Sequence, residues 1–143
     1  MLVDANLLIY ATDERSPKNE AAVAWIEEQL NGSRKVGLPW QSLATFLRIT
    51  THPRILDNPL SPAVAWQQID DWLAAPAAWV PVPGREHGRI LGEIVVEHDI
   101  RANLVPDAML AALALEHGLA VCSVDTDFAR FASDGLRWHN PLA

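Results

Sequence analysis

The chain begins Met1-Leu2-Val3-Asp4-Ala5-Asn6-Leu7-Leu8-Ile9-Tyr10, an apolar run that is interrupted by Asp4 and Asn6 and then resumes. An apolar run that ends abruptly at a polar residue is typical of a buried strand in a parallel sheet. Ligands of open α/β sheets bind at the carboxyl edge, where the residue after such a strand lies. Asp4 is therefore either the N-cap of a following helix or the first carboxylate of a functional site. This stretch alone leaves both interpretations open.

The rest of the chain alternates between helical and extended patterns. Pro17, Pro62 and Pro106 each stand at the start of a predicted helix, and Gly118 follows the last residue of one. Pro81 confines its strand to an edge of the sheet, because proline has no N–H to donate. The patterns predict helices over residues 7–11, 17–30, 40–51, 62–74, 85–98 and 107–117, and strands over 1–3, 36–38, 78–82, 120–123 and 136–139. Such alternation predicts an α/β fold, a three-layer α/β/α sandwich with a short central parallel sheet, formed by residues 1–143 as a single domain.

Composition limits the classes of function. The net charge is −7, with 18 acidic residues against nine arginines and two lysines. This balance argues against a broad basic face for nucleic acid, but it allows a nuclease whose acids hold cations. No apolar run reaches the ~18 residues of a membrane span and no signal peptide is visible, so we expect a cytoplasmic protein without a membrane contact. Cys122 is the only cysteine, which excludes an internal disulfide and a cysteine-rich metal site.

Four aspartates are expected to meet at the carboxyl edge of the predicted sheet. Asp4 follows the first strand, and Asp125 and Asp127 follow the fourth. Asp107 lies in the first turn of the helix before that strand, where the helix dipole favours a carboxylate. If the first and fourth strands are neighbours, the carboxylates converge, and each close pair repels by about 4 kcal/mol at an effective dielectric of ~20.

A cation would relieve this repulsion. Oxygen ligands without cysteine or clustered histidine indicate Mg²⁺, with Mn²⁺ as a substitute. Such an ion polarises a phosphate and activates water for phosphodiester hydrolysis. Each acid also has a structural interpretation: Asp4 and Asp107 could cap helices, and Asp125 with Asp127 could form an Asx-turn before a helix over residues 128–131. Those interpretations leave the shared location of the acids unexplained.

Four segments carry a family resemblance that spans almost the whole chain. They are Leu2-Val3-Asp4-Ala5-Asn6-Leu7-Leu8-Ile9-Tyr10-Ala11, Phe46-Leu47-Arg48-Ile49-Thr50-Thr51-His52-Pro53-Arg54, Val105-Pro106-Asp107-Ala108 with Leu110-Ala111-Ala112-Leu113-Ala114, and Ser123-Val124-Asp125-Thr126-Asp127-Phe128-Ala129-Arg130-Phe131. In this order they resemble PIN-domain ribonucleases, the toxin half of VapBC toxin–antitoxin pairs. The resemblance implies a Mg²⁺-dependent endoribonuclease with an RNA substrate, which forms a homodimer. It also implies a cognate antitoxin whose inserted segment fills the acidic groove.

The resemblance also implies roles for the residues at the edge of the sheet. Asp4, Asp107 and Asp125 would be catalytic and bind the metal directly. Asp127 would lie close to the ion and bind it through water. Asn6 would orient Asp4 or a water molecule on the metal.

One position departs from the family pattern. The family commonly carries a glutamate three residues before the arginine that matches Arg48, and Thr45 stands there. Gln41, one turn earlier on the same helix face, offers a neutral oxygen, and Asp13 is a distant candidate for the missing acid. Arg48 would hold a phosphate or pair with an acid. An alternative function is therefore a catalytically weakened PIN-fold module that binds RNA without cleaving it.

Other features favour structural roles or exclude a rival. An aspartyl phosphatase of the haloacid dehalogenase type needs a second acid where this chain has Asn6, and a late lysine that it lacks. His87 and His98 could share a helix face, but no other ligands are evident near them, so we expect surface or hydrogen-bonded roles. The six tryptophans are expected mostly in the core, with some at a dimer or antitoxin surface.

Overall fold

The computed structural model describes residues 1–143 and contains a five-stranded parallel sheet. The strands are β1 (Leu2–Val3), β2 (Val36–Gly37), β3 (Ala78–Trp79), β4 (Val121–Cys122) and β5 (Trp138–His139). Their order across the sheet is β3-β2-β1-β4-β5, so the first strand is central and β4 is its neighbour. Val3 is paired with Cys122, and both strands run in the same direction. The condition for the acids to converge is therefore met.

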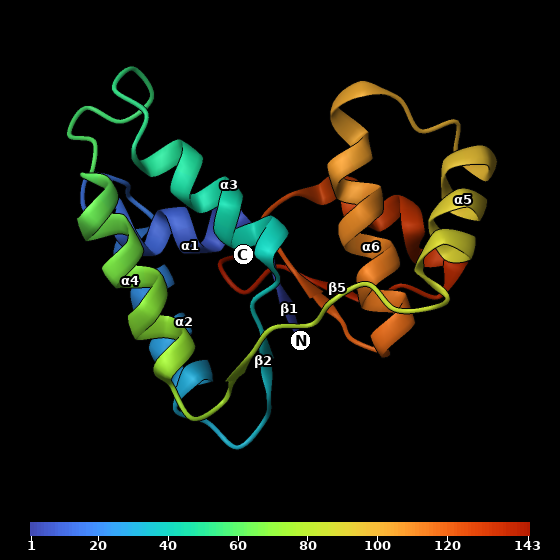
Figure 1. Cartoon of the computed structure of the whole chain (residues 1–143), viewed down its shortest axis with the longest axis horizontal. Helices are drawn as coiled ribbons and strands as arrows, with labels where there is room; N and C mark the ends of the chain where they lie inside the picture. The colour runs from blue at the N-terminus through green and yellow to red at the C-terminus, as the bar shows by residue number, and fades with distance from the viewer.

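Helices cover both faces of this sheet. They are α1 (Ala5–Thr12), α2 (Asn19–Leu30), α3 (Trp40–Thr50), α4 (Pro62–Ala74), α5 (His87–Glu97), α6 (Val105–His117) and the 3₁₀ helices η1 (Ala102–Leu104) and η2 (Thr126–Asp134). Figure 1 shows α1 to α4 grouped on one side of the strands and α5 and α6 on the other. The predicted three-layer α/β/α sandwich is confirmed. No helix combines the length and apolar character needed to span a membrane.

Each face of the sheet has its own hydrophobic core. Successive residues of a strand point to opposite faces, and Leu2 and Val3 accordingly belong to different clusters. The cluster under α1 to α4 includes Phe46, whose ring meets that of Trp72 edge to face at 4.8 Å. The other cluster is built on the small apolar residues of α6 together with Phe128 and Phe131 of η2. Both β1 and β4 are buried, so the backbone positions of the residues that follow them are fixed by the packing of the sheet.

Four predicted helix starts are wrong by two residues. The helices predicted from residues 85 and 107 begin at His87 and Val105. Local hydrogen bonds explain the other two. The helix predicted over 7–11 begins at Ala5, because Asp4 Oδ1 accepts the Ala5 N–H at 2.8 Å. The helix predicted from residue 17 begins at Asn19, since the Ser16 hydroxyl accepts the Lys18 N–H at 3.1 Å and holds residues 16–18 in a turn. Pro17 therefore lies outside the helix.

The third strand is shorter than the predicted 78–82. It spans only Ala78–Trp79 and lies at the edge of the sheet, as Pro81 predicted. The Pro81 ring packs so closely on β2 that a Cβ on Gly37 would lie 2.9 Å from it. Glycine is thus required at this point of β2. The final strand is present as Trp138–His139, and the helix predicted over 128–131 is the longer η2.

Candidate active site

Three of the four predicted acids converge at the carboxyl edge of β1 and β4. Asp107 lies in the first turn of α6, and Asp125 and Asp127 lie at the start of η2. Each offers a carboxylate oxygen, and these oxygens all lie within 4.8 Å of one another. The Asp125 carboxylate also accepts the Asp127 N–H at 2.8 Å, so the predicted Asx-turn exists beside the cluster. The structural and functional interpretations of Asp125 are therefore compatible.

Asp4 lies beside this cluster but outside the set of converging oxygens. Its Oδ1 caps α1, and its Oδ2 accepts hydrogen bonds from Ser123 Oγ at 2.7 Å and from Asn6 Nδ2 at 3.3 Å. The prediction that Asp4 caps the following helix is thus confirmed, and its second carboxylate oxygen still faces Ser123 and Asn6. The Asp127 carboxylate, rather than that of Asp4, is among the three that converge. The roles of Asp4 as a direct metal ligand and of Asp127 as a ligand through water remain predictions.

Asn6 and Ser123 hold the Asp4 carboxylate in place through hydrogen bonds. Asn6 Nδ2 donates to Ser123 Oγ at 2.9 Å, and Asn6 Oδ1 accepts the Val124 N–H at 3.4 Å. The predicted contact between Asn6 and Asp4 is therefore present. Ser123 was not predicted to contribute, although the pairing of Val3 with Cys122 makes Ser123 the residue opposite Asp4. A correct strand register would have identified it.

The electrostatics of the cluster show a shortage of positive charge. Burial raises the pKa of Asp107 to about 6, and the charges of Asp125, Asp4 and Asp127 contribute to this rise in that order, against a lowering by Arg130. Burial also raises the pKa of Asp4, although hydrogen bonds from Ser123 and Ala5 oppose the shift. Carboxylates with raised pKa values favour an added cation or a proton.

Arg130 is the second residue that sequence reasoning missed. Its Nη2 lies 3.2 Å from Asp127 Oδ1, and its Nε donates to the Asp127 carbonyl at 3.1 Å. Both side chains are partly exposed. The three-residue spacing on a helical turn was the available signal. Arg130 holds the Asp127 carboxylate in place and partly neutralises it.

The residues predicted on α3 lie at the other side of the cluster. Gln41 Nε2 donates to the Pro106 carbonyl at 2.7 Å, which ties the start of α3 to the start of α6 next to Asp107. Thr45 is half-buried and Arg48 is exposed. Their four- and three-residue spacing places all three on one face of α3. Asp13 does not replace the missing acid beside Asp4, because it ends α1 and therefore lies about 13 Å along that helix from Asp4.

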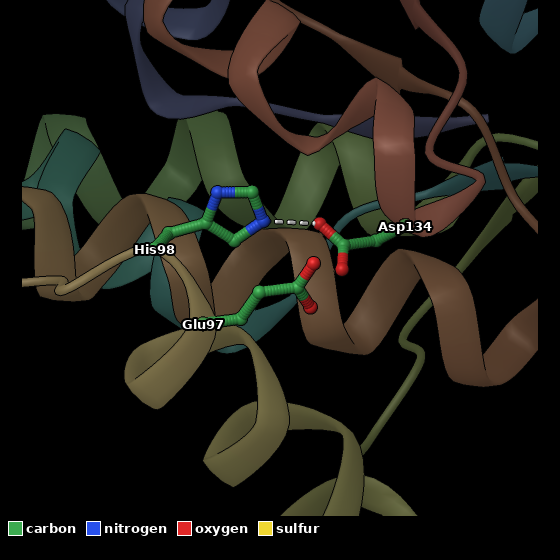
Figure 2. A group of neighbouring side chains, drawn as sticks. All are labelled: Glu97, His98 and Asp134. Atoms are coloured by element: carbon green, nitrogen blue, oxygen red, sulfur yellow. Dashed lines mark hydrogen bonds and ion pairs between the residues drawn. The ribbon is translucent and has the colours of Figure 1, made fainter.

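A separate group of possible ligands lies where α5 and η2 end. Figure 2 shows the Glu97 carboxylate and the His98 ring directed toward Asp134. His98 Nε2 lies 2.6 Å from Asp134 Oδ2, and the His98 ring meets that of Phe131 edge to face at 5.4 Å. The hydrogen-bonded role expected for His98 is confirmed, but the expectation that it lacks neighbouring ligands is wrong. The chain fold brings Asp134 to it from 36 residues away.

We expect His98→Ala to lower the free energy of unfolding by about 1–3 kcal/mol, because it leaves the Asp134 carboxylate buried without its partner. Urea unfolding at pH 7 measures the change. His139→Ala is the matched control, since its exposed side chain makes no hydrogen bond, and its expected effect is within about 0.5 kcal/mol. Equal stability of the two variants would show that the His98 pair contributes nothing to the fold.

Comparison with known proteins matches nearly the whole chain to one family. The PIN domain family matches residues 1–134. Ribonuclease VapC37 of Mycobacterium tuberculosis is 40% identical over 142 residues, which cover 99% of this chain and 97% of the relative. The chain belongs to the VapC family of PIN domains. Ribonuclease VapC33 of the same organism is 36% identical over 142 residues, 99% of this PIN domain and 98% of the relative.

Solved structures agree with this PIN-domain fold. The crystal structure of VapBC2 from Rickettsia felis, bound to a DNA fragment from its promoter, contains a chain that matches with a TM-score of 0.71. The match covers 97% of this PIN domain and 96% of that chain at 14% sequence identity. At this identity the likeness extends to the architecture alone.

Proposed function

We propose that the chain is a metal-dependent endoribonuclease, the toxin component of a type II toxin–antitoxin pair. The observation that carries the proposal is the convergence of the Asp107, Asp125 and Asp127 oxygens within 4.8 Å at the carboxyl edge of the sheet. VapC relatives at 36–40% identity over nearly the whole chain are named ribonucleases. These two lines of support come from independent observations.

The donor set fits Mg²⁺, with Mn²⁺ as a substitute. All converging donors are carboxylate oxygens, and no cysteine or histidine belongs to the group. We assign Asp107, Asp125 and Asp127 as metal-binding residues and Asp4 as the fourth acid of the centre. When bound, the ion would polarise the scissile phosphate and promote attack by water.

The chain's own residues prepare this centre. Asn6 and Ser123 fix the Asp4 carboxylate, and Arg130 fixes that of Asp127. Arg48 is exposed on the α3 face that carries Gln41 and Thr45, and its guanidinium is suited to a backbone phosphate of the RNA. The arrangement supports in-line hydrolysis of a phosphodiester whose phosphate lies between the acids and α3.

An antitoxin partner follows from the same charges. Solved structures with this fold include VapBC complexes. A cluster of carboxylates short of positive charge is best blocked by a cationic side chain, so we infer that the antitoxin places an arginine or lysine against these acids. We also infer a homodimer, because two large apolar side chains away from the acids, Ile55 and Val64, are 50% and 56% exposed on the single chain.

The test is cleavage of total cellular RNA by the purified chain, with and without EDTA. We expect fragments in Mg²⁺ or Mn²⁺, none after chelation, and recovery when excess Mn²⁺ is added back. Cleavage that continues in EDTA would refute the metal role. RNA binding without cleavage in any metal would favour the RNA-binding module that Thr45 suggests.

A further inference from the structure

A hollow lies at the same edge of the sheet as the acids, beyond the ends of β2 and β3. Its volume is about 240 Å³, and the residues that line it include Trp40, Gln41, Val82, His87 and Met109. Trp40 and Gln41 follow β2, and Val82 follows β3. Neighbouring strands lie about 4.8 Å apart, so the hollow is displaced from the end of β1 by ~5–10 Å along the edge.

An aromatic ring forms one wall of this hollow. Trp40 is 47% exposed, and its ring stacks on that of Trp66 with centroids 6.2 Å apart and planes 7° from parallel. The stack fixes the orientation of the Trp40 ring without burying it. A rigid, exposed indole is the surface on which single-stranded bases stack in proteins that bind them.

One polar group in the hollow has hydrogen-bonding capacity to spare. Gln41 uses its Nε2 on the Pro106 carbonyl, which leaves Oε1 as an acceptor. The same Gln41 bond joins the hollow to the first turn of α6, which carries Asp107.

The far wall is held in place by the end of α6. His117 Nε2 lies 2.8 Å from the Val82 carbonyl oxygen. The Glu116 carboxylate accepts the N–H groups of Gly84 and Glu86 at 2.7 and 2.9 Å. Figure 1 shows this segment crossing from the α4 side of the molecule to α5. The hollow is therefore preformed.

We propose that this hollow binds one unpaired RNA base next to the phosphate that is cleaved. The inference rests on the proposed ribonuclease function and adds a specificity site to it. The base would stack on Trp40, and its edge would donate a hydrogen bond to Gln41 Oε1. Stacking combined with a few hydrogen bonds to the base edge is how single-stranded RNA is recognised. The Gln41 bond to the Pro106 carbonyl makes the hollow continuous with the acids, which favours a base of the substrate over an apolar protein segment.

The test measures RNA binding in the Asp107→Asn background, which separates binding from cleavage. Fluorescence anisotropy in Mg²⁺ compares fluorescein-labelled octamers of adenosine, cytidine and uridine with an abasic octamer. We expect Trp40→Ala to weaken binding of the tightest octamer by about fivefold to a hundredfold, equivalent to ~1–3 kcal/mol, and Trp40→Phe to weaken it less. Binding of the abasic octamer should not change. Gln41→Met, which keeps the length of the side chain but has no carbonyl oxygen, should reduce the differences among the three bases.

Val96→Ala, at an exposed position on α5, is the control and should bind like the parent. Circular dichroism and thermal unfolding verify that each variant is folded. Unchanged octamer affinity in both Trp40 variants would overturn the inference. If Trp40→Ala instead converts a dimer to a monomer in sedimentation without altering RNA affinity, the hollow belongs to an interface between copies. Parent protein that never cleaves RNA, but binds octamers through Trp40, would refute the nuclease function and leave this site standing.

Discussion

Asp107→Asn is expected to reduce RNA cleavage by about a thousandfold or more while making the folded protein more stable. In the proposed mechanism Asp107 binds the metal, so its loss should remove several kcal/mol of transition-state stabilisation, and ~4 kcal/mol corresponds to about a thousandfold in rate. The gain in stability comes from the crowding of Asp107 with Asp125, Asp4 and Asp127 in a partly buried site. Single-turnover cleavage and urea unfolding measure the two effects on the same preparations.

The stability effect has a defined pH dependence. The pKa of Asp107 is about 6 in the folded chain, above its ordinary value of 3.8, so the folded state binds the proton more tightly. Without metal, stability therefore falls as pH rises from about 4 to about 6, and the full cost is present above that range. Asparagine carries no charge, so Asp107→Asn removes this loss of stability. Because the side chain is partly exposed to solvent, which screens these charges, we expect a gain of only about 1–2 kcal/mol at pH 7–8, and none at pH 4.

Asp70→Asn is the control for Asp107→Asn, because it removes a charge from an exposed position on α4. It should leave cleavage unchanged and show no comparable gain in stability at pH 7–8. Undiminished cleavage by Asp107→Asn would refute the assignment of Asp107 as a metal-binding residue. A lower stability at pH 7–8 than at pH 4, relative to the parent, would show that the carboxylate is stabilised rather than strained.

Thr45→Glu is expected to tighten Mn²⁺ binding at least tenfold, which is ~1.4 kcal/mol. Thr45 lies one turn from Gln41, which contacts the Pro106 carbonyl beside Asp107, so a glutamate there extends toward the acids. Affinity for a divalent ion depends on the number of charged ligands. Cleavage need not rise in proportion, because tighter binding of the ground state does not itself lower the barrier. Calorimetric titration with Mn²⁺ at one ionic strength measures the affinity.

Ala44→Glu is the matched control for position 45. It adds the same charge to the neighbouring position of α3, but on the exposed side. A general electrostatic effect would tighten Mn²⁺ binding in both variants. If the new carboxylate binds the ion directly, only Thr45→Glu should bind Mn²⁺ more tightly. If neither variant differs from the parent, position 45 lies away from the ion, and Gln41 becomes the remaining candidate on that helix.

The sequence predicted the layers of the fold because its apolar periods are local and strong. The order of the strands was predicted only as a condition, since the pairing of β1 with β4 joins residues about 120 apart and has no local signal. Helix ends depended on single hydrogen bonds. The Ser16 turn and the Asp4 cap each moved a boundary by about two residues, which periodicity does not resolve.

The sequence identified the acids of the candidate site, but not the hydrogen bonds that hold them or which of them lie closest together. Asp107, Asp125 and Asp127 were singled out because carboxylates that follow buried strands or begin helices lie near one edge of a parallel sheet. Their supporting residues were missed for a different reason: Ser123 and Arg130 are ordinary polar residues until the register and the 3₁₀ turn bring them to Asp4 and Asp127. The relative closeness of Asp4 and Asp127 depends on side-chain rotamers, which no sequence pattern encodes.

Cys122 lies in β4, immediately before Ser123, with only 3% of its surface exposed, and burial raises the pKa of its thiol to about 11. Thiol reagents attack the thiolate, so in the native protein they react only after β4 separates from its neighbours. With no second cysteine in the chain, the alkylation rate becomes a direct record of how often the strand beside the acids opens. The same property makes any cysteine introduced at the surface a unique attachment point for a spectroscopic label.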